Sequence, residues 1–247
     1  CVSNDGSWFI YIHHDRDSYA AIYPDGVFQP DRCGSYGTVL AAFNMDTGED
    51  RELVVINSPI HHVLPWRDDQ FIFCHPATEN GMLLTDLSGG WYTHLRTQDS
   101  EGGTVCHYVA TERGIAYEVL GRADGVWSGI YNPATHQRYE FRLPDSFGYT
   151  HTGRDPEGRL WFYETAAEGR HELHALLHHD PGGRDEWRPL SGNWTTYGGG
   201  QKSHFHPQLT PDRRWVLMTG GDESSSTNHI YLLDVSDFSD TVGIPTL

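Results

Sequence analysis

The chain has 247 residues, of which 34 are acidic and 17 are basic, giving a formal net charge of −17. This charge argues against a nucleic-acid partner, because phosphate binding requires a basic surface. No run approaches the roughly 18 consecutive apolar residues that a membrane helix requires, and the N-terminus lacks the charged and apolar regions of a leader peptide. We therefore expect a cytoplasmic protein with no membrane partner.

Short β-rich runs follow turn-like triplets five times along the chain. In chain order they are NDG-SWFIYI from residue 4, RDD-QFIFCH from 67, ERG-IAYEV from 112, PEG-RLWFYE from 156 and PDR-RWVLMT from 211. A second strand and an outer hairpin follow each of the first four runs, in the segments VLAAFNMDTGEDREL, MLLTDLSGGWYTHL, SGIYNPATHQRYEF and HALLHHDPGGRDEWRPL. The fifth run is followed by a second strand in HIYLLDVSD. No helix-length amphipathic segment interrupts this series.

The order turn, strand, strand, turn, strand is typical of a β-propeller blade, and the spacing of about 45 residues between successive turns agrees with it. We therefore predict an all-β fold in which residues 1–247 form a single β-propeller domain with five visible blades. The chain starts at Cys1 in the middle of the pattern, which favours a larger ring whose N-terminal blades lie upstream.

Histidines recur at one position of this repeat. Counting back five residues from four consecutive turns gives His62, His107, His151 and His206. Equivalent positions of successive blades converge around one mouth of the central channel of a propeller. A single such histidine is most simply structural, as a bond to backbone or a packing contact between blades.

The segment QKSHFHP, residues 201–207, adds polar residues to the last of these positions. In an extended segment side chains alternate, so His204 and His206 face the same way, and Gln201 can join them through a bend. Facing histidines beside a glutamine favour metal ligation over a solvated loop. His75, at the end of the FCH strand, fits a functional and a structural role equally well.

These residues resemble oligogalacturonate lyase, polysaccharide lyase family 22, whose members are seven-bladed propellers. The resemblance rests on the Gln-x-x-His-x-His-Pro run before a TPD turn, the FCH strand end, and the histidines one and two blades upstream. It covers roughly the last five blades, and two further blades would explain the abrupt start.

The resemblance implies a Mn²⁺ ion, or another divalent cation, and an acidic oligosaccharide substrate. By motif, the ligands would be His151, Gln201, His204 and His206. The catalytic base would be His107 in VCHYVATERG, and His75 would contact substrate.

The match is incomplete around the substrate. This sequence has FCHPATENGM where the family has FCHEGPW, it lacks the arginine that follows there, and CHYV replaces the family's HEFW. The ligand pattern is intact, whereas the sugar specificity stays open. His62, Arg113 and Arg154 are further candidates for substrate binding, since arginine pairs with carboxylates through two hydrogen bonds. As turn residues, the two arginines are expected to be exposed.

This donor set suits β-elimination from a uronate, in which a base removes the C5 proton and the 4-linked sugar leaves. A cation on the C6 carboxylate stabilises the developing charge, and a neutral histidine accepts the proton. Three alternatives remain open: a binding propeller without chemistry, a lyase for another uronate polymer, and a hydrolase that uses metal-bound water.

Overall fold

The computed structural model contains the whole chain and describes part of it. The described residues are 1–14, 37–56, 60, 62–67, 69–75, 81–96, 103–145, 147, 152–155, 157–167, 170–177, 186–194, 205–221 and 227–236. All eighteen elements that it defines in these residues are β-strands, which confirms the all-β prediction. Within the same residues, no helix combines the length and the apolar character needed to cross a membrane.

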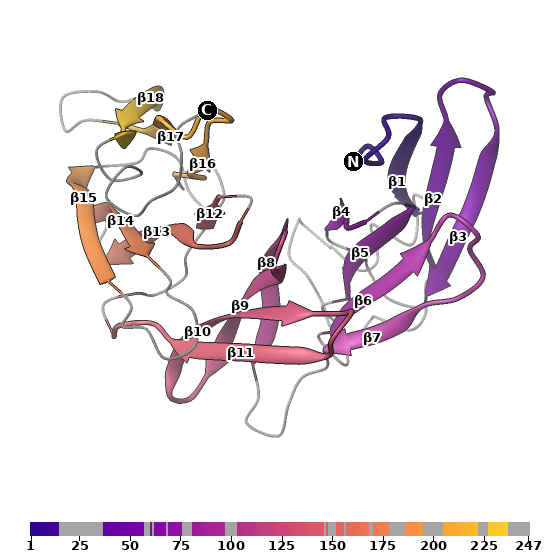
Figure 1. Ribbon diagram of the computed structural model, residues 1–247, viewed down its shortest axis with the longest axis horizontal. Helices are drawn as coiled ribbons and strands as arrows, with labels where there is room; N and C mark the ends of the chain where they lie inside the picture. Colours follow the sequence, from indigo (N-terminus) through magenta and orange to yellow (C-terminus); the bar gives the residue numbers. More distant parts are fainter. Residues whose placement is uncertain are drawn as a thin grey trace. The chain divides into compact units, whose positions relative to one another are not determined.

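The strands form five small antiparallel sheets, each built from consecutive strands (Figure 1). The first has the order β1-β2-β3, with strands Trp8–His14, Thr38–Asn44 and Asp50–Ile56. The second is β4-β5-β6-β7, with Val63–Pro65, Gln70–His75, Gly81–Asp86 and Thr93–Arg96. The third is β8-β9-β10-β11, with Thr104–Thr111, Gly114–Arg122, Gly125–Asn132 and Gln137–Arg142.

The fourth and fifth sheets follow the same scheme. The fourth is β12-β13-β14-β15, with Thr152–Arg154, Leu160–Ala167, Arg170–Leu177 and Glu186–Trp194. The fifth is β16-β17-β18, with Gln208–Leu209, Trp215–Gly220 and His229–Asp234. All five predicted runs are strands, namely β1, β5, β9, β13 and β17. Four sheets also contain a strand that precedes the turn triplet, namely β4, β8, β12 and β16. The pattern of apolar residues did not predict these four strands.

The burial of each strand follows from its sequence. In β13 the residues Leu160, Trp161, Phe162 and Tyr163 are fully buried, so both faces of this strand are covered, as a continuous apolar run predicts. The polar outer strand β11 is largely exposed. Burial of each large apolar side chain stabilises the fold by about 1.5–3 kcal/mol.

The chain forms two compact units, which are described separately. The first comprises Cys1–Ala110, Tyr117–Asp124 and Tyr131–Arg138, and the second comprises Thr111–Ala116, Gly125–Ile130 and Tyr139–Leu247. A core of the first unit packs Trp8 and Leu53 of the first sheet with Phe71 and Phe73 of the second. In the second unit, one core joins Leu160 and Phe162 to Phe205 and Val216.

Candidate functional site

The histidine positions occupy the same place in successive sheets. His62 directly precedes β4, His107 lies within β8, and His206 comes shortly before β16. Each of these strands is the first of its sheet and lies at its edge, beside the strand that follows the turn. His151 lies outside the described residues, directly before β12. The three described histidines therefore lie in, or just before, the first strand of their sheets.

Two of them share an unusual backbone conformation. The φ angle is 46° at His107 and 47° at His206. Residues other than glycine rarely adopt this left-handed region, at a cost of about 1–3 kcal/mol. Such strain persists only where the surroundings fix it, and it is concentrated at functional sites. His136 and Arg213 also have positive φ angles, of 56° and 60°, so the conformation is shared by the two predicted site histidines without being confined to them.

His107 contacts two side chains of the first unit. Its Nδ1 atom lies 2.9 Å from Oε2 of Glu118 on β9, and its side chain is 11% exposed whereas that of Glu118 is 0% exposed. The Sγ atom of Cys106 lies 3.8 Å from the same Nδ1 atom. The side chains next to His107 are thus the Cys106 thiol and the Glu118 carboxylate, and neither residue was among the predicted site residues.

These three residues form the one group of His, Cys, Asp and Glu in the described part of the chain that could hold a metal ion, since their potential ligand atoms lie within 4.8 Å of one another. Glu118 could have been noticed as a lone carboxylate in the apolar run IAYEV. Nothing in the sequence around Cys106 indicated that its thiol would lie beside His107.

The segment before β4 is bonded to β8. The Tyr108 hydroxyl donates a hydrogen bond of 2.9 Å to the carbonyl oxygen of His62, and the rings of the two residues meet edge to face with centroids 6.3 Å apart. His62 is exposed and Tyr108 is buried. The segment that carries His62 therefore lies beside β8 in the first unit.

His206 is presented to solvent by buried neighbours. Phe205 and Pro207 are buried, whereas His206 between them is exposed. The Phe205 N–H donates to Oε2 of the buried Glu164 at 3.0 Å, and the Phe205 carbonyl oxygen accepts the Thr219 N–H at 2.9 Å. This anchoring fixes the backbone that carries His206.

The same segment lies against β12 in the second unit, and β16, which follows it, contacts β12 (Figure 1). A Cβ atom placed on Gly153 would lie 2.2 Å from the carbonyl oxygen of Pro207. Gly153 comes two residues after His151, and Pro207 comes directly after His206. The chain next to one predicted ligand therefore lies against the chain next to another.

The two arginines differ in burial. Arg154 is 7% exposed, so the expectation that it is exposed was wrong. Its guanidinium carbon lies 4.5 Å from the centre of the Trp161 ring, and its Nη1 atom donates to Oγ1 of Thr152 at 2.7 Å. Stacking on the indole explains the burial, since a guanidinium is weakly hydrated and packs on aromatic faces. Arg113 is half-buried.

A buried carboxyl group lies beside Arg154 in the sequence. Burial, together with a hydrogen bond to Glu157, raises the pKa of Asp155 to about 7. Its Oδ1 atom accepts the N–H groups of Arg159 and Leu160 at 2.8 Å and 2.6 Å. Glu157 is also paired with Arg213. This network closes the turn between β12 and β13.

The remaining predicted residues are not described in full. Gln201 and His204 lie outside the described residues, as His151 does. His75 ends β5, where its backbone pairs with Gly81. The prediction that these side chains bind a metal ion or substrate therefore stays a prediction.

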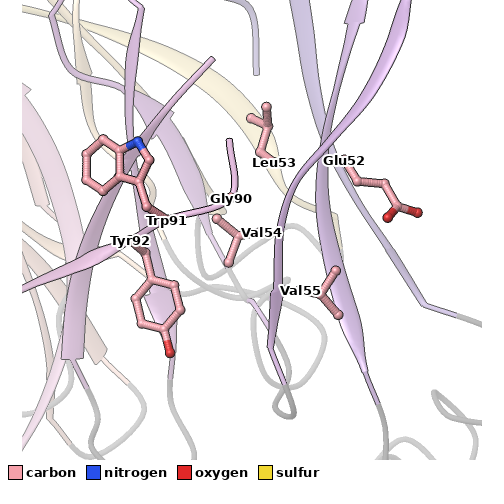
Figure 2. A pocket seen from close by; sticks show the side chains of 7 residues that line it. All are labelled: Glu52, Leu53, Val54, Val55, Gly90, Trp91 and Tyr92. Carbon is pink, nitrogen blue, oxygen red and sulfur yellow. The ribbon is translucent and has the colours of Figure 1, made fainter. Parts of the chain in front are cut away.

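A hollow of about 470 Å³ lies elsewhere in the first unit (Figure 2). It is lined by Glu52, Leu53, Val54 and Val55 of β3 and by Gly90, Trp91 and Tyr92. Figure 2 shows that the Glu52 carboxylate points away from the two aromatic rings. Among the described residues, no predicted site residue lines this hollow, so we do not assign the chemistry to it.

Several solved structures resemble this chain. An oligogalacturonate lyase in complex with manganese has a TM-score of 0.75 and 16% identity, covering 94% of this chain and 63% of that one. An oligogalacturonate lyase from Vibrio parahaemolyticus has a TM-score of 0.75 and 17% identity, covering 96% and 65%. The β-propeller domain of the trilobed protease from Pyrococcus furiosus has a TM-score of 0.60 and 11% identity, covering 94% and 67%.

No model of a known protein family matches the sequence, and no curated protein matches it. At these low identities, the likeness to solved structures shows the fold, and the predicted β-propeller is confirmed. The chain spans less than two thirds of the length of the two lyases.

Proposed function

We propose that this chain is part of a metal-dependent lyase that cleaves uronate oligosaccharides such as oligogalacturonate by β-elimination. The fold likeness to two oligogalacturonate lyases supports the proposal. The observation that carries it is the contact of Gly153 with Pro207, because it brings the segments next to His151 and His206 together, as a shared ligand set requires.

The residues suit a divalent cation such as Mn²⁺. His206 is exposed between two buried residues, and the hydrogen bonds of Phe205 fix the backbone that carries it. The proposed ligands are His151, Gln201, His204 and His206, which are all neutral donors. Neutral ligands leave the charge of a cation undiminished for an anionic substrate.

In this proposal His107 is the base. When bound, the cation would neutralise the C6 carboxylate of the uronate and stabilise the negative charge that develops there. His107 accepts the C5 proton, which positioned acid–base catalysis accelerates by roughly 10²–10⁴-fold. Its partly exposed side chain allows contact with a substrate.

Substrate contacts are assigned to His62, His75, Arg113 and Arg154. His62 is exposed and lies beside Tyr108, the residue after the proposed base. Of the two arginines, Arg113 is half-buried, whereas Arg154 is buried against Trp161.

The test is an assay of the intact protein with digalacturonate and Mn²⁺. We expect the ultraviolet absorbance of a 4,5-unsaturated uronate to rise, and to stay flat with EDTA or with His107→Ala. His229→Ala is the matched control, since His229 is an exposed histidine on β18, and it should retain the rate.

The rival readings give different results. Metal binding without turnover of galacturonate would point to a different uronate substrate, and cleavage without an unsaturated product would point to a hydrolase. Absence of both metal binding and turnover would refute the lyase proposal and leave a propeller that only binds.

A further inference from the structure

A buried carboxylate lies in the middle of β9. The Glu118 side chain is 0% exposed, and every residue from Gly114 to Val119 is buried. Burial of an ionised carboxylate costs several kcal/mol unless a partner compensates it. A residue of this kind in an apolar strand therefore requires an explanation in its contacts.

One contact of this carboxylate is with His107. The Oε2 atom lies 2.9 Å from Nδ1 of the imidazole, across the pair of strands β8 and β9. A neutral imidazole has one N–H, and an ionised carboxylate only accepts hydrogen bonds. The hydrogen therefore belongs on Nδ1, which leaves the lone pair on Nε2.

The backbone around His107 is fixed as well. Its φ angle of 46° is in the left-handed region, and the next residue, Tyr108, is buried and bonded to the His62 carbonyl oxygen. The imidazole is thus restrained on one side by Glu118 and along the chain by Tyr108. A base needs this kind of restraint, because its reactive atom must be held in place.

We propose that Glu118 is a positioning residue that holds His107 as the Nδ1–H tautomer, so that Nε2 is the atom that accepts the substrate proton. This rests on the proposed function, in which His107 is the base. Nε2 takes the proton from C5, the electron pair of that C–H bond forms the C4–C5 double bond, and the C4–O bond breaks with its pair on the departing oxygen. Water protonates that oxygen, and the imidazolium returns its proton to solvent.

Glu118 contributes to both states of the histidine. In the resting state it fixes the tautomer, and after proton transfer its negative charge lies beside the imidazolium. A carboxylate that orients a histidine in this way changes activity or ligand affinity by about 10–100-fold in metal sites, where such pairs are common. We expect a loss of kcat of about this size when it is removed.

The competing use of the same atoms is a metal site made by Cys106, His107 and Glu118. A cation on Nδ1 would displace the hydrogen that Nδ1 donates to Glu118, and the Cys106 sulfur would be a thiolate ligand. The two uses exclude each other, because Nδ1 cannot hold a hydrogen and a metal ion together. Co²⁺ distinguishes them, since a thiolate ligand gives it a charge-transfer band in the near ultraviolet.

The experiment records the imidazole nitrogen resonances of His107 in the intact ¹⁵N-histidine-labelled protein, assigned by their absence in His107→Gln. We expect a protonated Nδ1 and an unprotonated Nε2. In Glu118→Leu, which removes the carboxylate and keeps an apolar side chain of similar size, the tautomer preference should be lost. Glu118→Leu leaves the Nδ1–H of His107 without this acceptor, which destabilises the folded state, so the folded state of the variant is checked by thermal denaturation beside Glu118→Gln, which keeps an acceptor.

Kinetics of the same variants provide the second measurement. Glu118→Leu should lower kcat about 10–100-fold with little change in KM, and should have no further effect in a His107→Ala background. Glu118→Gln, which keeps an acceptor without the charge, should have a kcat between those of the wild type and Glu118→Leu. Glu112→Leu, an exposed carboxylate in the turn of the same hairpin, should match the wild type in both measurements.

The outcomes separate this inference from the proposed function. A hydrogen on Nε2 in the wild type, or the cobalt charge-transfer band on addition of Co²⁺, would overturn the role of Glu118. A tautomer that depends on Glu118 in a protein without lyase activity would support the role of Glu118 and refute the proposed function.

Discussion

The carbonyl oxygen of Pro207 lies against the Cα atom of Gly153 so closely that a methyl group on Gly153 would be 2.2 Å away from it. Both partners in this contact are backbone, so no side-chain rotation relieves a clash. The two residues belong to the segments that follow His151 and His206. The contact therefore sets how far apart these two segments lie.

Gly153→Ala should separate these segments. Overpacking of this kind lowers the free energy of unfolding by about 1–3 kcal/mol, and we expect weaker Mn²⁺ binding as well. Thermal denaturation and calorimetric titration of Mn²⁺ check the two effects. Gly37→Ala is the control, since its methyl group would meet only Cγ1 of Val55 at 3.7 Å. A Gly153→Ala protein with wild-type stability and metal affinity would contradict the assigned contact.

His206→Gly should separate ligation from folding. Glycine adopts the left-handed conformation of this position without the penalty of about 1–2 kcal/mol that other residues incur, so stability should be equal or higher. Mn²⁺ binding should fall, because an imidazole ligand is removed. Denaturation and metal titration are measured on the same protein. Reduced stability with unchanged metal affinity would mean that His206 is structural.

Glu164 should support the metal site without touching it. Its carboxylate accepts the Phe205 N–H at 3.0 Å and is buried. Glu164→Leu leaves that N–H without this acceptor, at a cost of about 1–3 kcal/mol, and should weaken Mn²⁺ affinity about 10–100-fold.

Glu164→Gln is the matched variant, since its amide oxygen can accept the same hydrogen bond. We expect it to retain most of the stability and most of the affinity. Equal losses in the two variants would show that the charge of Glu164, and not its hydrogen bond to Phe205, is what matters. Metal titration of both proteins decides between these results.

Asp155 should make stability depend on pH. Its pKa is raised from the usual value of 3.8 to about 7 in the folded state, chiefly by burial. The folded state thus holds a proton that the unfolded state has lost, and stability falls as the pH rises from about 4 to about 7, by on the order of 1 kcal/mol per pH unit.

Asp155→Asn should remove this dependence. The asparagine keeps an oxygen for the N–H groups of Arg159 and Leu160, and it does not titrate. We expect a smaller slope of unfolding free energy across this pH range, and a variant more stable than the wild type at pH 8. Urea denaturation at several pH values measures the slope, with the exposed Asp46→Asn as control. A slope that Asp155→Asn leaves unchanged would assign the effect to another group.

The long strands were predictable because their apolar runs are local signals. RLWFYE became β13 and QFIFCH became β5, each directly after its turn triplet. The strands β12 and β16 were missed because two or three residues carry no periodicity; they form by pairing with the strand after the turn.

The features missed at the site depend on residues distant in the sequence. The burial of Arg154 requires the indole of Trp161 on the next strand, which a turn motif does not show. The link between His107 and Glu118 spans eleven residues across two strands. The left-handed backbone of His107 and His206 has no local sign, because glycine or asparagine is the usual occupant of that conformation.

The backbone conformation of these two histidines has a consequence for laboratory evolution. A library randomised at residues 107 and 206 and sorted for heat resistance alone should fill with glycine and asparagine, because both relieve the left-handed strain. The same library sorted for turnover should return histidine at both positions. If the proposed roles of His107 and His206 are right, selection for heat resistance alone would therefore remove both residues, because their left-handed backbone favours glycine or asparagine.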